Sequence, residues 1–224
     1  MSNARDDGGE SKGVLIVDDH PIVRQGVRML IEQQEDLHVV AEAESAAEAL
    51  RALSDAPADV AVVDLTLKES SGLELIKDIR SRWPDVCILV LSMRDEAFYA
   101  ERCLRAGARG YVTKEQGPTE VIEGIRSILA GKVHLSESMA AKVLSKFAGA
   151  QSGATSLTET LTDRELEIYQ LIGSGLTTRE ISERLHVSPK TVDSHREHIK
   201  DKLGLDTAND LLKHAIHWMQ QNTG

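Results

Sequence analysis

Five side chains in the first 120 residues lie at the ends of short apolar runs and have complementary chemistry. Asp18 and Asp19 follow the first run, Asp64 follows the third, Ser92 ends the fourth and Lys114 closes the fifth. In an open α/β sheet, ligands gather at the carboxyl ends of the strands. We therefore expect three carboxylates, a hydroxyl and an ammonium to converge on one edge.

This group of side chains favours phosphoryl transfer. Three neighbouring carboxylates repel one another, which raises their pKa values unless a cation neutralises them. An oxygen-only ligand set with open positions suits Mg²⁺, whereas a lysine and a serine can hold phosphoryl oxygens. Positioning and charge neutralisation do most of the catalysis in such transfers. The sequence shows no base, glycine-rich phosphate loop or nucleotide pocket, so the expected acceptor is the carboxylate of Asp64.

The elements that must position these side chains alternate between strands and helices. Several apolar runs are apolar on successive residues, as in parallel strands buried on both faces. The runs lie at 14–17, 39–41, 60–63, 87–91 and 110–112. Helical patterns follow them at 21–33, 45–53, 73–82, 97–106 and 118–130. The order predicts an α/β doubly wound, five-stranded parallel sheet with right-handed crossovers.

The residues at the strand ends resemble the receiver domain of bacterial response regulators. The matching segments are Val-Asp18-Asp19-His-Pro, Val-Val-Asp64-Leu, Val-Leu-Ser92 and Gly-Tyr111-Val-Thr-Lys114. The resemblance covers about residues 12–130 and implies a flavodoxin-like receiver in which a sensor histidine kinase phosphorylates Asp64. A single aspartate at a strand end is ordinarily a turn or helix cap, and we interpret the neighbouring His20 in the same way. Five matching positions at one edge of the sheet indicate a functional site rather than five separate caps.

The resemblance also implies a metal site. Asp19 and Asp64 would bind Mg²⁺, with Asp18 acting through water and the backbone carbonyl of Thr66 as a further ligand. The family often has proline four residues after the acceptor, where this chain has Lys68. A charged loop at that position could change the lifetime of the phosphorylated state in either direction.

The same resemblance implies that Ser92 and Lys114 bind the phosphoryl group and that Tyr111 acts as a switch. Ser92 and Lys114 would hold the phosphoryl oxygens. Tyr111 would turn inward when Ser92 moves, although on its own it would be interpreted as a packed strand residue. Its position three residues before Lys114 is what matches the family pattern.

The pattern changes after residue 130. We assign 131–160 to a linker with one helix at about 136–147, followed by a small, polar stretch that is flexible by composition. Residues 161–220 read as a small all-α domain. Helix 178–185, a two-residue turn and a helix opening at Ser188 predict a helix-turn-helix.

The second helix of this pair is the expected DNA-reading helix. It should bury Val192, Ile199 and Leu203 and present its other faces to double-stranded DNA. Its outward N-terminal residues would read base edges, and its basic flanks would contact phosphates. The candidate contacts are Lys190, Thr191, Asp193, Ser194, His195, Arg196, Glu197 and Lys200.

The C-terminal part resembles the LuxR-type DNA-binding domain. The shared signature is Leu161-Thr-Asp-Arg-Glu165, Gly175-Leu-Thr-Thr-Arg-Glu-Ile181, Leu185-His-Val-Ser-Pro-Lys-Thr191-Val192, His195 and Lys202-Leu203-Gly204. Together with the receiver, it is similar to the NarL/FixJ class of response regulators. The resemblance implies a phosphorylation-dependent transcription factor that binds promoter DNA. We expect phosphorylation to free the C-terminal domain or to drive formation of a homodimer. It also implies no enzyme activity beyond phosphoryl transfer to, and slow loss from, Asp64.

The charge of the helical domain leaves an alternative open. From residue 159 onward there are 11 acidic and 8 basic residues, a net of −3, and Asp193 and Glu197 lie on the expected reading face. Such a face could instead bind a partner protein, which would make the chain a receiver-based adaptor. A third reading, a phosphohydrolase, lacks a second acid or base beside Asp64.

The composition of the chain argues against several other classes of protein. A net charge of −10 argues against coating of nucleic acid by bulk charge, and 3% aromatic residues argue against base-stacking platforms. Cys87 and Cys103 form no disulfide framework and indicate a reducing compartment. Because no apolar signal core or membrane-length run is present, we expect a soluble cytoplasmic protein without a membrane partner.

Overall fold

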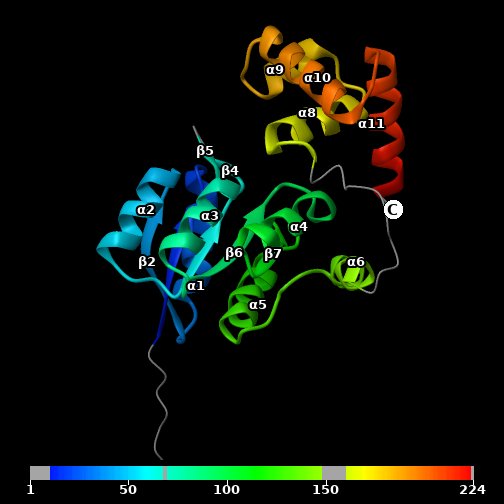
Figure 1. Ribbon diagram of the computed structural model, residues 1–224. Helices are drawn as coiled ribbons and strands as arrows, with labels where there is room; N and C mark the ends of the chain where they lie inside the picture. The colour runs from blue at the N-terminus through cyan, green and yellow to red at the C-terminus, as the bar shows by residue number, and fades with distance from the viewer. Residues whose placement is uncertain (1–10, 68–69, 148–159, 223–224) are drawn as a thin grey trace, which may run out of the picture. The chain divides into compact units, whose positions relative to one another are not determined.

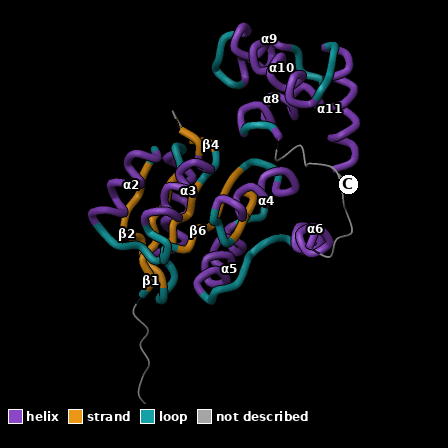
Figure 2. The backbone as a smooth tube through the Cα atoms, in the orientation of Figure 1, coloured by secondary structure: helices purple, strands orange, loops and turns teal. Residues whose placement is uncertain are grey.

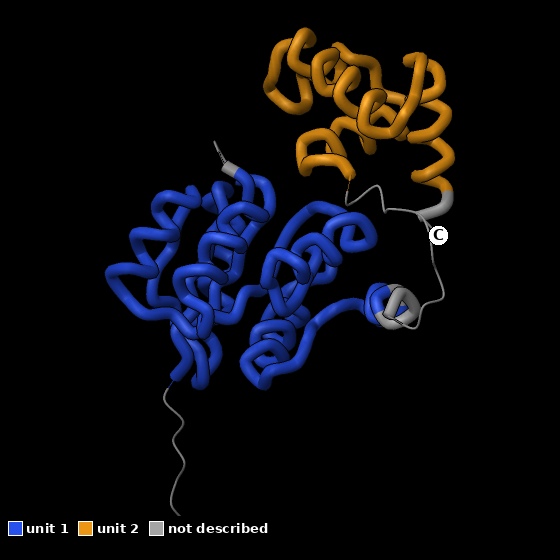
Figure 3. Tube along the Cα trace, viewed as in Figure 1, with its two compact units in different colours: residues 1–147 blue, residues 148–224 orange. Residues whose placement is uncertain are grey.

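The computed structural model describes residues 11–67, 70–147 and 160–222. The chain divides into two compact units, residues 1–147 and 148–224 (Figure 3). Lys68 and the small, polar stretch of the expected linker lie outside the described residues. Within the described ranges, no helix is both long enough and apolar enough to cross a membrane.

A five-stranded parallel sheet forms the centre of the first unit (Figures 1 and 2). Its strands are β1 (Lys12–Val17), β2 (Leu37–Ala43), β3 (Val60–Val63), β6 (Cys87–Ser92) and β7 (Gly110–Thr113). Their order across the sheet is β2-β1-β3-β6-β7. The helices that follow them are α1 (Pro21–Glu32), α2 (Ala46–Asp55), α3 (Gly72–Arg82), α4 (Glu96–Ala106) and α5 (Pro118–Leu129). The predicted α/β fold is confirmed.

Burial on both faces explains the apolar runs. Helix α1 contacts α5 on one face of the sheet, whereas α3 contacts both α2 and α4 on the other. Val14 and Ile16 of β1 belong to the core cluster that includes residues of α1 and α5. Their neighbours Leu15 and Val17 are equally buried. Because successive residues point to opposite faces of a strand, all four positions must be apolar.

A short hairpin follows the third strand. Strands β4 (Thr66–Leu67) and β5 (Ser70–Ser71) pair antiparallel, and helix α3 begins at the next residue, Gly72. A Cβ atom at Gly72 would lie 2.1 Å from the carbonyl oxygen of Asp64. Only glycine lets the first turn of α3 approach the end of β3 this closely.

After α5 the chain returns to the edge of the sheet. The amide of Tyr111 in β7 donates to the carbonyl of His134, and the amide of His134 donates to the carbonyl of Arg109. Helix α6 (Glu137–Phe147) then contacts α4, and the amide of Ser136 donates to Glu96 at 2.9 Å. The segment leaving the sheet is therefore hydrogen-bonded to both β7 and α4.

The second unit is helical in its described part. Its helices are α8 (Asp163–Gly173), α9 (Thr178–Arg184), α10 (Pro189–Leu203) and α11 (Ala208–Asn222). Thr162 and Thr177 open α8 and α9 with reciprocal capping boxes, and Ser188 caps α10. These caps satisfy amide groups that a helix leaves unpaired at its start. The helix-turn-helix formed by α9 and α10 has the predicted bounds to within one residue.

Candidate functional site

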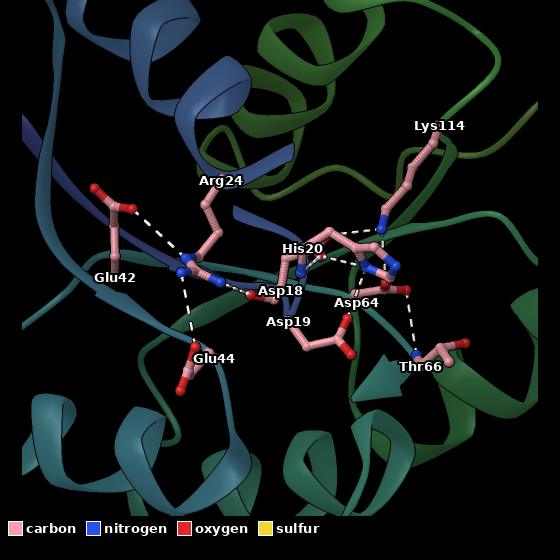
Figure 4. A network of polar contacts seen from close by, with 9 residues as sticks. All are labelled: Asp18, Asp19, His20, Arg24, Glu42, Glu44, Asp64, Thr66 and Lys114. Carbon is pink, nitrogen blue, oxygen red and sulfur yellow. Dashed lines mark hydrogen bonds and ion pairs between the residues drawn. The ribbon is translucent and has the colours of Figure 1, made fainter. Parts of the chain in front are cut away.

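Three predicted site residues meet at the carboxyl edge of the sheet (Figure 4). The Nζ atom of Lys114 lies 2.6 Å from Oδ2 of Asp18 and 2.6 Å from Oδ2 of Asp64. The side chains are 10%, 4% and 3% exposed, respectively. The hypothesis required residues 64 and 114 to meet, and they do, although 50 positions separate them in the sequence. The other oxygen of Asp64, Oδ1, accepts from the amide of Thr66.

Burial and the ion pair shift the pKa values of Asp64 and Lys114 in opposite directions. Burial is the largest influence on the pKa of Asp64, and the pKa is raised overall although the hydrogen bond and charge of Lys114 lower it. Burial also works against the charge on Lys114, but its hydrogen bonds with Asp18 and Asp64 raise its pKa overall. The lysine is therefore held as an ammonium ion between two carboxylates.

Asp19 and His20 complete the cluster. Ring atom Nδ1 of His20 lies 2.7 Å from Oδ1 of Asp19 and 3.1 Å from Oδ1 of Asp18. Even so, Oδ1 of Asp19 is buried and makes no hydrogen bond. Donor atoms of Asp18, Asp19, His20 and Asp64 all lie within 4.8 Å of one another. Three carboxylates and one ammonium leave a charge of −2, which a divalent cation fits.

Sequence reasoning missed Arg24, which lies beside Asp18 at the edge of the cluster (Figure 4). Its Nη1 donates to the backbone carbonyl of Asp18 at 2.6 Å. The same guanidinium lies 3.7 Å from the carboxylate of Glu42, in β2, and 3.9 Å from that of Glu44, which directly follows β2. Arg24 thus holds the loop that carries Asp18 and Asp19. The only sign of this role in the sequence is that a basic residue lies near the start of helix 21–33.

Ser92 and Tyr111 lie on neighbouring strands beside Lys114. Ser92 is fully buried, its hydroxyl accepts from the amide of Arg94, and its carbonyl accepts from the amide of Lys114. Tyr111 is 1% exposed and donates its hydroxyl to the carbonyl of Arg94 at 2.8 Å. Burial is the main reason that the pKa of Tyr111 is raised. The aromatic ring is therefore already in an inward position in this structure.

Helix α10 exposes half of the predicted DNA contacts. The exposed members are Lys190, Asp193, Ser194 and Glu197, and the half-buried ones are Thr191, His195, Arg196 and Lys200. Val192 and Ile199 are buried as predicted, whereas Leu203 is only half-buried.

Some of these side chains are paired within the domain. Asp193 accepts from the hydroxyl of Thr178 in α9, and Glu197 pairs with Lys200 at 2.8 Å. His195 differs from the others because its Nδ1 is buried and makes no hydrogen bond. Burial lowers its pKa, and the nearby charge of Arg164 adds to this.

A buried carboxylate of α8 faces the C-terminal end of α10. Oε2 of Glu165 accepts from Nζ of Lys202 at 2.6 Å and from the amide of Thr162 at 2.7 Å. Burial raises the pKa of Glu165, but these hydrogen bonds lower it overall. Sequence reasoning identified Glu165 as a capping residue and did not anticipate its ion pair with α10.

Comparison with known protein families identifies both units. Residues 14–126 match the response regulator receiver domain, and residues 159–215 match the bacterial regulatory proteins of the luxR family. The chain belongs to the LuxR-type response regulators. This combination of domains is that of a two-component transcriptional regulator rather than of an enzyme, as the sequence predicts.

Characterised relatives resemble the chain over nearly its full length. The oxygen regulatory protein NreC of Staphylococcus aureus is 34% identical over 91% of this chain and 96% of that protein. RcsB of Salmonella enterica serovar Typhimurium, solved on a promoter with the phosphomimetic BeF3⁻, is 29% identical over 92% and 98%, with a TM-score of 0.59. A structure of two RcsB dimers on two parallel DNAs is 30% identical over 91% and 97%, with a TM-score of 0.55.

Proposed function

We propose that Asp64 accepts a phosphoryl group from a phosphohistidine of a sensor kinase, and that this modification controls promoter binding by the domain at 161–220. The observation that carries the proposal is the ammonium of Lys114, buried between the carboxylates of Asp18 and Asp64 at 2.6 Å from each. Without a neutralising charge, an anionic phosphoryl donor would be repelled from this edge of the sheet.

Each residue has a defined part in the transfer. A carboxylate oxygen of Asp64 attacks phosphorus while the P–N bond of the phosphohistidine breaks. The histidine nitrogen keeps the electron pair and takes up a proton, and an acyl phosphate remains on Asp64. Lys114 exchanges its contact with the Asp64 carboxylate for a phosphoryl oxygen, and the Ser92 hydroxyl donates to another.

The acidic cluster fits a magnesium ion. Asp18, Asp19 and Asp64 would hold it, with the backbone carbonyl of Thr66 as a further ligand. The buried Oδ1 of Asp19, which makes no hydrogen bond, and the charge of −2 in the cluster support this assignment. When bound, Mg²⁺ would neutralise charge on the phosphoryl oxygens during transfer.

Buried groups next to Lys114 would carry the signal away from Asp64. Movement of the Ser92 hydroxyl toward the phosphoryl group would change the space beside Tyr111, whose hydroxyl is fixed to the carbonyl of Arg94. Tyr111 is thus the proposed switch residue. Phosphorylation would bias two arrangements of this face and favour a homodimer.

The helical domain is proposed to read double-stranded DNA with the exposed face of α10. RcsB, the relative solved on promoter DNA and as dimers, supports both the ligand and the dimeric state. Lys190 and Ser194 lie near the start of α10, where such helices contact base edges. The exposed Asp193 and Glu197 repel phosphate. They would therefore restrict binding to DNA sequences whose bases donate hydrogen bonds to these carboxylates, as the N4 amino group of cytosine can.

Phosphorylation with labelled acetyl phosphate in Mg²⁺ tests the acceptor. We expect wild-type protein and the exposed control Asp85→Asn to take up label, and Asp64→Asn to take up none while keeping its circular dichroism spectrum. Label on Asp64→Asn at the wild-type level would overturn the assignment. Footprinting on genomic DNA, with and without phosphorylation, then tests the output. Specific binding should fall steeply with salt, and an absence of retained DNA at every salt concentration would favour the adaptor alternative.

A further inference from the structure

We propose that Glu165, His195 and His198 form a binding site for a divalent transition-metal ion of the Zn²⁺ class in the helical unit. Each side chain offers one donor atom, and these atoms lie within 4.8 Å of one another. Glu165 belongs to α8, whereas both histidines belong to α10. A bound ion would therefore fasten the DNA-reading helix to α8.

An unpartnered buried nitrogen supports the site independently of this spacing. Among the described residues, two buried side-chain N or O atoms make no hydrogen bond: Oδ1 of Asp19 and Nδ1 of His195. Each of these two residues belongs to one of the two clusters whose donor atoms are spaced for a metal ion. A buried polar atom without a partner loses its hydrogen bonds to water and gains none in the folded protein, which is unfavourable. A metal ion would supply the partner that the His195 nitrogen lacks.

The carboxylate of Glu165 is already held in place for such a role. Its Oε2 accepts from Lys202 and from the amide of Thr162, so Oε1 remains for the ion. Carboxylate ligands of metal sites are commonly fixed by hydrogen bonds of this kind. The charge of Lys202 also balances that of Glu165, so the two neutral imidazoles would supply most of the affinity.

The donor chemistry selects a different ion from that of the receiver. Mg²⁺ prefers oxygen ligands, which the aspartate cluster provides, whereas two imidazoles with one carboxylate suit Zn²⁺. Zn²⁺ bonds of about 2.0–2.1 Å in a tetrahedron place donor atoms roughly 3.3 Å apart. The side chains must therefore close by at most roughly 1.5 Å. The exposed His198 can make this movement by rotating its side chain.

Zinc titration of the full-length protein tests the proposal. The protein is kept in excess Mg²⁺, and Zn²⁺ affinity is measured by competition with a chromogenic chelator. We expect the exposed-site variant His198→Gln to bind the helical unit's Zn²⁺ at least tenfold more weakly than wild type. The control is His186→Asn, because His186 is exposed in the same unit and asparagine tolerates its positive φ of 53°.

A second measurement needs no variant. Zinc should shift the imidazole NMR resonances of His195 and His198 and leave those of His186 unchanged. Equal zinc affinity of His198→Gln and wild type would overturn the proposal, as would zinc-dependent shifts confined to other histidines. A purely structural role of Glu165 and His195 in helix packing predicts neither the affinity loss nor the shifts.

Discussion

Replacing Lys114 by glutamine isolates the contribution of the buried ion pair. The change removes the ammonium 2.6 Å from two carboxylates that are only 3–4% exposed. Removing one partner of a buried pair costs about 3–5 kcal/mol, because the remaining charge stays buried and uncompensated. Glutamine keeps a hydrogen-bond donor, so we expect the lower part of this range, about 3–4 kcal/mol. At an m-value of about 2 kcal/mol/M, the urea midpoint should fall by about 1.5–2 M.

The assay is urea unfolding at pH 7 without divalent ions. A Trp218→Phe background leaves Trp83 as the fluorescence probe of the receiver. Lys77→Gln is the matched control, because Lys77 pairs with Glu74 at the surface and such pairs contribute about 0–1 kcal/mol. Mg²⁺ should reduce the difference in urea midpoint between Lys114→Gln and wild type. It should stabilise the variant more, because the variant's acidic cluster carries one more uncompensated negative charge.

The pH dependence of this variant has a definite sign. The pKa of Asp64 is raised in the folded protein, so ionisation of Asp64 opposes folding. This penalty is absent below the ordinary value of 3.8 and develops as the pH rises through the folded pKa. Because Lys114 lowers the pKa of Asp64, its removal should raise that pKa further and enlarge the penalty at neutral pH. The loss of stability in Lys114→Gln should therefore be smaller at pH 4.5 than at pH 7. A midpoint within about 0.5 M of the Lys77→Gln control at pH 7 would refute the reasoning.

Four further predictions concern other positions. Gly72→Ala should lower labelling of Asp64 by acetyl phosphate at least tenfold, because its Cβ would lie 2.1 Å from the Asp64 carbonyl. Gly26→Ala, with open space around its Cβ inside α1, should instead raise the unfolding free energy by about 0.5–1 kcal/mol; a loss would contradict this. Glu165→Gln should destabilise the helical unit by about 2 kcal/mol in thermal unfolding, since its partner is partly exposed. Because the pKa of Glu165 is lowered, this difference should be present above its ordinary value of 4.5 and vanish as the pH falls through the folded pKa; persistence in acid would count against the ion pair. Tyr111→Phe should lower the free energy of unfolding in urea by about 0.5–1.5 kcal/mol, the usual value of a hydrogen bond such as that from its hydroxyl to the carbonyl of Arg94. A loss above about 3 kcal/mol would contradict this.

The sheet could be predicted from the sequence because its physical cause is local. Parallel strands covered on both faces must be apolar at successive positions, and this pattern shows in the residues themselves. The site at the carboxyl edge follows from the same reasoning. Asp18, Asp64 and Lys114 each close a strand, so predicting the strands also brings their side chains together.

The features that were missed depend on partners distant in the sequence. Nothing local to Arg24 indicates that it donates to the carbonyl of Asp18, and nothing local to Lys202 indicates that it pairs with Glu165 in another helix. His195 was assigned to the DNA-reading face from helical spacing alone. Its Nδ1 is buried because α8 packs beside it, which helical spacing within α10 does not reveal. The hairpin at 66–71 has no glycine or proline turn signal.

The hydrogen bonds of His134 with β7 have a practical consequence for dissecting the protein. An uncovered outer strand presents unpaired amide and carbonyl groups, which recruit other chains into aggregates. In this chain the segment around His134 caps that strand, pairing with Tyr111 and Arg109. A receiver fragment that stops at residue 130 would lose this cover and expose β7 to self-association. A fragment that continues through α6 would keep it, and is the better choice for isolating the domain.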